Sequence, residues 1–282
     1  RDISTENLKT ALTTVMIFLI PVALLLLQNE AGIAIVYLAI LPVVLFWSGL
    51  PHGISLFMIS PAIIGYFTVL DLVWGGIAAV IIAIAIFLLQ RRTWLTITSI
   101  ALGLVILVGT EIALNQVLQP HQRARIEAFA NPSLDPLGAG WNVLQAKTAI
   151  GSGGLYGKGF MEGTQTQLRF LPEQWTDFIF CVVGEEFGFV GAGVVILLFG
   201  MLFLRMIRMA SAHNHPFAQL VIISVTFLFF IHFVINIGMT IGLVPVIGIP
   251  LPFFSYGGYS LWGFTILLFI FVKLDAQRLE IL

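Results

Sequence analysis

Asp177 is the residue of this chain whose position best suits it to chemistry. It is the last charged residue before a strongly apolar run that begins at Phe178. The polar segment in front of it, residues 118–176, contains the cations Arg123, Arg125, Lys147, Lys158 and Arg169. A carboxylate beside a cation-rich loop can take a proton from a hydroxyl as general base while the cations bind an anionic group. The pattern therefore indicates chemistry on an anionic substrate at a membrane surface.

Simpler roles compete for the same side chains. Thr176 and Asp177 precede a predicted helix, and Asp is a common N-cap residue at such a position. If Asp177 is the base, Thr176 can supply the cap instead. For each cation, a solvated loop charge or a contact with lipid headgroups is the alternative to substrate binding.

The composition predicts the fold class. Hydrophobic residues make up 59% of 282 and charged residues 10%, and the mean hydropathy is +1.04. A soluble protein needs a more charged surface, so we expect an all-α, polytopic integral membrane protein. The formal net charge of −1 argues against a nucleic-acid partner, and the single cysteine, Cys181, excludes an internal disulfide.

About eight apolar runs have the length of a bilayer crossing. Pro61 lies inside the third run and predicts a break or a tilt there. The chain begins at Arg1 with no signal-peptide pattern, which suggests a start inside a longer protein. We treat 1–282 as one membrane domain whose large loop spans 118–176. The predicted crossings are approximately Ala11–Leu27, Gly32–Trp47, Ile54–Val69, Val73–Leu89, Leu95–Val117, Phe178–Met206, Phe217–Ile241 and Tyr259–Leu274.

The basic residues predict the orientation. Eight crossings place both termini on the same side, and Lys and Arg in short loops mark the cytoplasmic side. Both termini are therefore predicted to be cytoplasmic and the large loop external. The basic residues of the termini and short loops all fall on the cytoplasmic side in this arrangement: Arg1, Lys9, Arg91, Arg92, Arg205, Arg208, Lys273 and Arg278.

The large loop shows local order. Trp141–Ile150 has the periodicity of a short amphipathic helix, which tryptophan would favour at the membrane interface. The next residues, 150–159, are dense in glycine, which suits either close approach to phosphate or sugar oxygens or turns that fold the loop back over the membrane. Gln165 and Gln167 alternate, so in an extended segment both amides would point toward sugar hydroxyls; an ordinary polar strand is the alternative.

Polar residues inside apolar runs form a separate group. Glu185 and Glu186 follow Asp177 at a distance of about 12 Å along a helix. Carboxylates within a membrane usually face a cavity or a partner. Helical geometry places Glu185 nearer the face of Asp177, so we expect Glu185 to extend the catalytic cavity and Glu186 to anchor another helix or loop. His232 and Asn236 are further interior-facing candidates, and we expect an interhelical hydrogen bond for His232.

Several long motifs occur in one order. They are Gln-Arg-Ala-Arg-Ile (122–126) followed by Asn131-Pro132, Gly-Thr-Gln-Thr-Gln-Leu-Arg-Phe-Leu-Pro-Glu (163–173), Thr-Asp-Phe-Ile-Phe (176–180), Gly-Glu-Glu-Phe-Gly (184–188) and Pro-Val-Ile-Gly-Ile-Pro-Leu-Pro-Phe-Phe-Ser-Tyr-Gly-Gly (245–258). Together they resemble the SEDS family (shape, elongation, division, sporulation) of cell-wall polymerases, from about Leu24 to the end. The Gly-Thr-Gln-Thr-Gln run is closer to the RodA branch, which acts in elongation, than to the FtsW branch, which acts in division.

The sequence also departs from the family pattern. Trp175 stands where the family usually has His, and Ile247 stands in place of Thr in a Val-Thr-Gly sequence. Gln28-Asn29-Glu30-Ala31-Gly32 replaces Gln-Pro-Asp-Leu-Gly. Family members carry further helices ahead of the first apolar run. These departures bear on substrate detail more than on the reaction.

The resemblance implies an inverting peptidoglycan glycosyltransferase in the bacterial inner membrane. It would polymerise lipid II, an undecaprenyl-pyrophosphate-linked disaccharide-pentapeptide, into glycan strands during cell elongation. Asp177 matches the position of the family's catalytic aspartate. Alternatives are a lipid II flippase, a non-catalytic scaffold of a cell-wall complex, and an FtsW-like division polymerase. The substrate contacts that we predict are Arg123, Lys158, Gln165, Gln167, Arg169, Thr176 and Glu185.

The resemblance further implies a class B penicillin-binding protein as partner, alongside contacts with membrane lipids. It also implies a divalent cation, Mg²⁺ or Mn²⁺, shared between a carboxylate and the pyrophosphate. The sequence itself shows no cluster of His, Cys, Asp and Glu with metal-ligand spacing.

Overall fold

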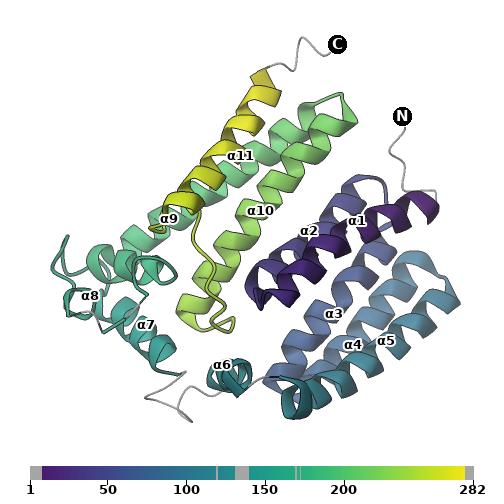
Figure 1. Ribbon diagram of the computed structural model, residues 1–282, viewed down its shortest axis with the longest axis horizontal. Coiled ribbons are helices and arrows are strands. Elements are labelled where there is room, and N and C mark those ends of the chain that lie inside the picture. Colours follow the sequence, from purple (N-terminus) through teal and green to yellow (C-terminus); the bar gives the residue numbers. More distant parts are fainter. Residues whose placement is uncertain (1–7, 119, 131–139, 169, 172, 277–282) are drawn as a thin grey trace.

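A computed structural model of the chain is built from helices (Figure 1) and describes residues 8–118, 120–130, 140–168, 170–171 and 173–276. Within these ranges there is no strand. The elements are α1 (Leu8–Leu27), α2 (Ala31–Trp47), α3 (His52–Leu70), α4 (Leu72–Gln90), α5 (Thr93–Ile112), a π-helical turn (Ala113–Val117), α6 (Pro120–Ala130), α7 (Trp141–Ser152), α8 (Thr164–Gln167), α9 (Ile179–Ala212), α10 (Pro216–Ile241) and α11 (Gly258–Ala276).

Each of the eight predicted apolar runs forms a helix. Six helices, α3, α4, α5, α9, α10 and α11, are long and apolar enough to cross a membrane, while Thr13–Leu27 and Ala31–Trp47 are shorter apolar helices. Large hydrophobic side chains such as Val80, Leu88 and Val105 are exposed on α4 and α5. Such surfaces suit hydrocarbon rather than water, so the chain is a multi-pass membrane protein.

Pro61 does not break α3, so the break that the sequence offered as one of two outcomes is wrong. The helix continues from His52 to Leu70 with Pro61 inside it. A proline lacks the N–H that would bond the carbonyl four residues earlier, here that of Phe57. The Ser60 hydroxyl donates to this carbonyl at 2.6 Å, so the carbonyl keeps a partner.

The helices form two groups (Figure 1). Helices α3, α4 and α5 pack together in the N-terminal half, and α9, α10 and α11 in the C-terminal half, while α2 packs against α10 and connects the halves. The C-terminal core is rich in aromatic residues, among them Phe199, Phe203 and Phe229. The loop helices α6, α7 and α8 lie at one end of the helices, opposite the end at which α11 terminates.

Helix α9 is interrupted at Gly188, whose φ of 67° and ψ of −163° are not helical. Only glycine adopts such a conformation at little cost. The glycine-dense stretch of the loop inserts its backbone at this break and satisfies the groups that the helix leaves unpaired. The hydrogen bonds are Phe189 N to Gly154 O (2.9 Å), Val190 N to Leu155 O (3.1 Å), Lys158 N to Glu185 O (3.0 Å) and Gly159 N to Glu186 O (3.1 Å).

The glycines therefore serve close packing of the loop on α9. A Cβ atom at Gly157, where φ is +81°, would overlap the backbone carbonyl of Glu186. Of the two interpretations of this stretch, the structure shows the one in which glycine turns fold the loop back. Glu185 and Glu186 belong to the short helical segment before the break in α9, a helix that α7 and α8 contact.

Candidate active site

The carboxylate of Asp177 lies in a tight turn just ahead of α9. The N-cap position of α9 is Phe178, and no side chain caps this end of the helix by a hydrogen bond. The N-cap interpretation of Asp177 is therefore wrong, as is that of Thr176, whose hydroxyl donates to the Glu173 carboxylate at 3.0 Å. Among the described residues the Asp177 carboxylate has no hydrogen-bond partner, and the side chain is half-buried.

The backbone around Asp177 is, in contrast, well connected. Three successive carbonyls, those of residues 175–177, each accept a hydrogen bond from the C-terminal half of the chain. Gly248 also lies against the carboxylate, since a Cβ atom there would be 3.2 Å from Asp177 Oδ2. The donors are Tyr256 N to Trp175 O (2.8 Å), Ser255 Oγ to Thr176 O (2.5 Å) and Asn236 Nδ2 to Asp177 O (2.9 Å).

The environment shifts the protonation equilibrium of this carboxylate. Partial burial raises the pKa of Asp177 above its ordinary value, and the nearby Glu173 carboxylate raises it further. The positive charge of Arg125 opposes both and lowers the pKa. A carboxylate with a raised pKa is a stronger base once ionised, which suits proton abstraction.

The cation that acts on Asp177 is not the one favoured from the sequence. Arg123 forms an ion pair with Glu127, one helical turn away on α6, with a 2.6 Å distance between Nε and Oε1. Arg125, on the same helix, is the arginine whose charge acts on Asp177. The motif contains both residues, and only the packing of α6 distinguishes them. Arg169 lies outside the described residues.

Glu185 has a structural environment rather than the cavity-lining one that we expected. Its side chain is fully buried and accepts hydrogen bonds from Lys158 Nζ at 2.8 Å, Gln165 N at 2.9 Å and Thr166 N at 3.0 Å. Lys158 also donates to the Thr164 hydroxyl at 2.6 Å. The predicted substrate contacts Lys158 and Glu185 are thus paired with each other and hold α8 against α9.

Gln165 and Gln167 do not form the extended segment that their alternation suggested. They belong to the single turn of α8, in which residues two apart point in different directions. The Glu185 carboxylate explains the turn, because it binds the backbone amides of Gln165 and Thr166 together. Gln167 is exposed, while Gln165 Oε1 is buried without a partner among the described residues.

Two polar side chains of α10 face this region. His232 Nδ1 lies 3.2 Å from the carbonyl of Pro250 in the 245–258 loop, so its hydrogen bond is with a loop rather than with another helix as predicted. Asn236 is fully buried and contacts the Asp177 backbone directly. The sequence marks Asn236 only as a polar residue in an apolar helix, and does not reveal this partner.

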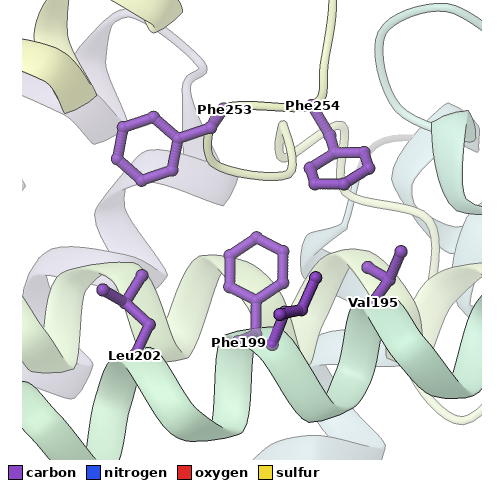
Figure 2. Close-up of a pocket in the computed structure, with 6 residues that line it drawn as sticks. Val195, Phe199, Leu202, Phe253 and Phe254 are labelled. Atoms are coloured by element: carbon purple, nitrogen blue, oxygen red, sulfur yellow. The ribbon is translucent and has the colours of Figure 1, made fainter.

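An apolar pocket of about 180 Å³ lies beside the loop. Figure 2 shows Phe253 and Phe254 of the loop pointing toward Val195, Phe199 and Leu202 of α9. The rings of Phe199 and Phe254 are 5.9 Å apart. These contacts pack the 245–258 loop onto α9 next to the Asp177 turn, which the same loop holds through Ser255.

Comparison with known proteins decides the family. The sequence pattern of the family described as "Cell cycle protein", which comprises FtsW, RodA and SpoVE, matches residues 56–280. The chain belongs to the FtsW/RodA/SpoVE family. This is the SEDS family that the motifs resembled.

Several relatives in the FtsW/RodA/SpoVE family carry names that state an activity. The peptidoglycan glycosyltransferase RodA of Treponema pallidum is 36% identical over 94% of this chain and 67% of its own length. MrdB of Escherichia coli, also named a peptidoglycan glycosyltransferase, is 44% identical over 51% of this chain and 39% of its own. A chain from a solved peptidoglycan synthase complex aligns with a TM-score of 0.47 at 25% identity, over 80% of this chain and 68% of that one.

In this FtsW/RodA/SpoVE member the signature motifs converge in space. The 163–173 and 184–188 motifs meet through Glu185, and the 176–180 and 245–258 motifs meet at Asp177. At the first junction, backbone amides donate hydrogen bonds to the oxygens of the Glu185 carboxylate. At the second junction, the hydrogen bonds go to the backbone carbonyls of Thr176 and Asp177, and the Asp177 carboxylate oxygens accept none from the described residues.

Proposed function

We propose that this chain is a peptidoglycan glycosyltransferase that polymerises lipid II, with Asp177 as general base. The observation that carries the proposal is the open carboxylate of Asp177 in a turn whose backbone is fixed. Family membership and the names of the relatives support the reaction type. The T. pallidum alignment spans 67% of that relative and the E. coli alignment 39%, so we extend the activity to this chain as our proposal.

The reaction transfers a sugar from a lipid pyrophosphate to a hydroxyl. The acceptor hydroxyl oxygen bonds to the anomeric carbon of the donor while the bond from that carbon to the pyrophosphate oxygen breaks, which inverts the configuration. Asp177 takes the hydroxyl proton, and the lipid pyrophosphate leaves with the bonding electron pair. General-base assistance of this kind typically contributes roughly 10²–10⁴-fold to the rate.

The leaving pyrophosphate requires positive charge. Arg125 is our candidate, since its charge already acts on Asp177, whereas Arg123 is paired with Glu127 and Lys158 with Glu185. Guanidinium groups bind phosphate oxygens with two parallel hydrogen bonds, which suits Arg125 to this role. Arg169 stays a prediction from its motif.

The residues around Asp177 fit a divalent cation only if the substrate shares it. The described residues contain no group of three or more His, Cys, Asp or Glu side chains that would hold a metal. Mg²⁺, however, commonly binds through one or two carboxylates together with substrate phosphates. Asp177 and the neighbouring Glu173 would supply such oxygens, and the cation would neutralise pyrophosphate charge.

The cellular setting is part of the proposal. We place the protein in the bacterial inner membrane with both termini cytoplasmic, because the basic residues of short loops fall on that side. The loop helices and Asp177 then face outward, where lipid II is polymerised. We further propose a class B penicillin-binding protein as partner and a role in elongation, which the RodA and MrdB relatives favour.

Polymerisation of labelled lipid II by the purified protein, with and without the penicillin-binding partner, tests this function. Asp177→Asn should lose glycan synthesis while the protein still folds, whereas Glu162→Gln, at an exposed loop carboxylate, should retain it. Normal polymerisation by Asp177→Asn would rule out the base. Transport of lipid II across vesicle membranes without glycan synthesis would instead indicate a flippase, and binding of the partner with neither activity a scaffold.

A further inference from the structure

The side-chain amide of Asn236 links the two segments that meet at Asp177. Asn236 lies on α10 and is fully buried. Its Nδ2 donates both to the carbonyl of Asp177 at 2.9 Å and to the carbonyl of Ile249 at 2.8 Å. Both N–H groups of the amide are therefore used, one on the Asp177 turn and one on the 245–258 loop.

The environment of the Asn236 amide oxygen indicates that the side chain is needed for its hydrogen-bond donors. Oδ1 is buried without a hydrogen-bond partner among the described residues. An unpaired buried acceptor is unfavourable, so this environment uses the amide for its donors alone. Asn is the smallest neutral side chain with two donors on one atom.

Ser255 makes the second link between the same segments. Its hydroxyl donates to the carbonyl of Thr176 at 2.5 Å and accepts from the backbone amide of Leu251 at 2.7 Å. The hydroxyl thus closes the turn of the 245–258 loop and attaches that turn to the residue before Asp177. The backbone on both sides of the Asp177 Cα atom is held by side chains from elsewhere in the sequence.

We propose that Asn236 and Ser255 are positioning residues that set the direction of the Asp177 carboxylate. The inference rests on the proposed function and adds how the base is oriented. Most buried carboxylates are oriented by hydrogen bonds to their own oxygens, but here that would occupy the lone pairs needed for the acceptor proton. Fixing the backbone instead orients the side chain and leaves both oxygens available. An error of 1 Å in such a group can cost roughly 10²-fold in rate.

Kinetics of Asn236 and Ser255 variants test the inference. In the full chain acting on lipid II, Asn236→Ala and Ser255→Ala should lower kcat by roughly 10²-fold with KM nearly unchanged, because substrate contacts stay intact. Ser255→Thr keeps the hydroxyl and should retain most of kcat. Thr240→Val is the matched control: Thr240 is equally buried on α10, but its hydroxyl bonds only within the helix, to Ile237.

Asn236→Asp adds a signature that a purely structural role would not give. An ionised carboxylate at position 236 cannot donate to the two carbonyls, whereas a protonated one can donate to one of them. Residual kcat relative to wild type should therefore rise as the pH falls. Glu173 and Arg125 act on Asp177 in both proteins, but an ionised carboxylate at position 236 would itself raise the pKa of Asp177, so the two rate–pH profiles are compared over their whole range.

A measurement without turnover separates this inference from the proposed function. Labelling of Asp177 by a water-soluble carbodiimide, followed by mass spectrometry, reports how the carboxyl is presented. Asn236→Ala and Ser255→Ala should label at rates several-fold different from that of wild type, whereas Thr240→Val should match wild type. If wild type makes no glycan, the proposed function fails and the labelling alone decides the positioning. If both alanine variants match Thr240→Val in kcat and in labelling rate, the positioning role is wrong. If Asn236→Ala fails to fold, the Ser255 variants test the positioning role.

Discussion

The carboxylates of Glu185 and Asp177, both in family motifs, differ in how many hydrogen bonds their oxygens accept. The Glu185 side chain is fully buried, and its oxygens accept from one ammonium group and two backbone amides at 2.8–3.0 Å. Asp177 is half-buried, and within the described chain its hydrogen bonds are made by its backbone alone: its N–H donates to the Glu173 carbonyl at 3.1 Å and its carbonyl accepts from Asn236 at 2.9 Å. Both are acidic residues close to the start of α9, yet one is saturated and the other is open.

The difference separates a structural carboxylate from a reactive one. A carboxylate that already accepts several charge-assisted hydrogen bonds has little affinity for another proton and no lone pair directed at a substrate. A carboxylate with a fixed backbone and free oxygens can bind a hydroxyl and take its proton. Burial in a membrane protein therefore does not by itself mark a catalytic acid, and the pattern of occupied oxygens is the better guide.

Among the variants that test this difference, substitution of Glu185 should have the largest effect on the stability of the folded protein. Glu185→Ala removes the counter-charge of the Lys158 ammonium and leaves two buried backbone amides without an acceptor, which should lower the free energy of unfolding by about 3–5 kcal/mol. Glu185→Gln retains an acceptor and should lose less. Thermal unfolding in detergent micelles, with Glu162→Ala as the exposed control, measures both. Equal transition temperatures for Glu185→Ala and Glu162→Ala would contradict a structural role.

The second-largest effect on stability should come from Gly157, whose close contact with α9 brings Lys158 to Glu185. Gly157→Ala places a Cβ against the Glu186 carbonyl at a φ of +81°, so it should destabilise the protein by about 1–3 kcal/mol. Gly151→Ala is the matched control, because Gly151 is helical in α7 with open space around its Cα, and alanine there should be neutral or stabilising by up to about 1 kcal/mol. The same unfolding assay compares them; a reversed order would show that the loop does not depend on this close approach.

The helices were largely predictable from the sequence, whereas the break in α9 and the turn at α8 were not. Long apolar runs predicted the crossing helices, and the periodicity of 141–150 predicted α7, because local patterns carry both. The break at Gly188 was not predicted, since a glycine in an apolar run reads as helix unless the loop that bonds to it is known. The turn at Gln165 was missed for the same reason: its cause is the distant Glu185 carboxylate.

Of the site, family motifs supplied Asp177 as the base, and this role stays a prediction. The sequence favoured Arg123 over Arg125, although the two share a motif and differ only in the direction in which α6 presents them. It could not show that Asn236 reaches the Asp177 carbonyl, because polar residues in apolar helices usually bond to other helices. Only the structure shows which residues far apart in the sequence form hydrogen bonds with each other.

A smaller effect should distinguish the two arginines on α6. Arg125→Gln removes the positive charge that lowers the pKa of Asp177, so the pH at which activity is half-maximal should move upward. It should also raise KM for lipid II about tenfold, or about 1.4 kcal/mol of binding. Arg123→Gln loses only an exposed pair within one helix, worth about 0.3–0.5 kcal/mol. Rate–pH profiles of both variants test this; identical profiles would remove Arg125 from the site.

The smallest expected effect is the change in stability on neutralising Asp177, and its sign is opposite to that at Glu185. Because the folded-state pKa of Asp177 is raised, the folded protein binds this proton more tightly than the unfolded chain does. The resulting stabilisation is fully present below the unfolded-state pKa and is lost as the pH rises through the folded-state pKa. At neutral pH the ionised carboxylate is therefore mildly unfavourable.

Asp177→Asn should consequently be as stable as wild type at neutral pH or slightly more stable, by less than about 0.5 kcal/mol. This small advantage should disappear in acid, where wild-type Asp177 is itself neutral. Thermal unfolding of both proteins across this pH range measures the difference. A clear loss of stability at neutral pH would mean that the Asp177 oxygens bind something in the folded protein, and the carboxylate would then be structural, like that of Glu185. Equal or greater stability combined with lost glycan synthesis is the result that a reactive carboxylate requires.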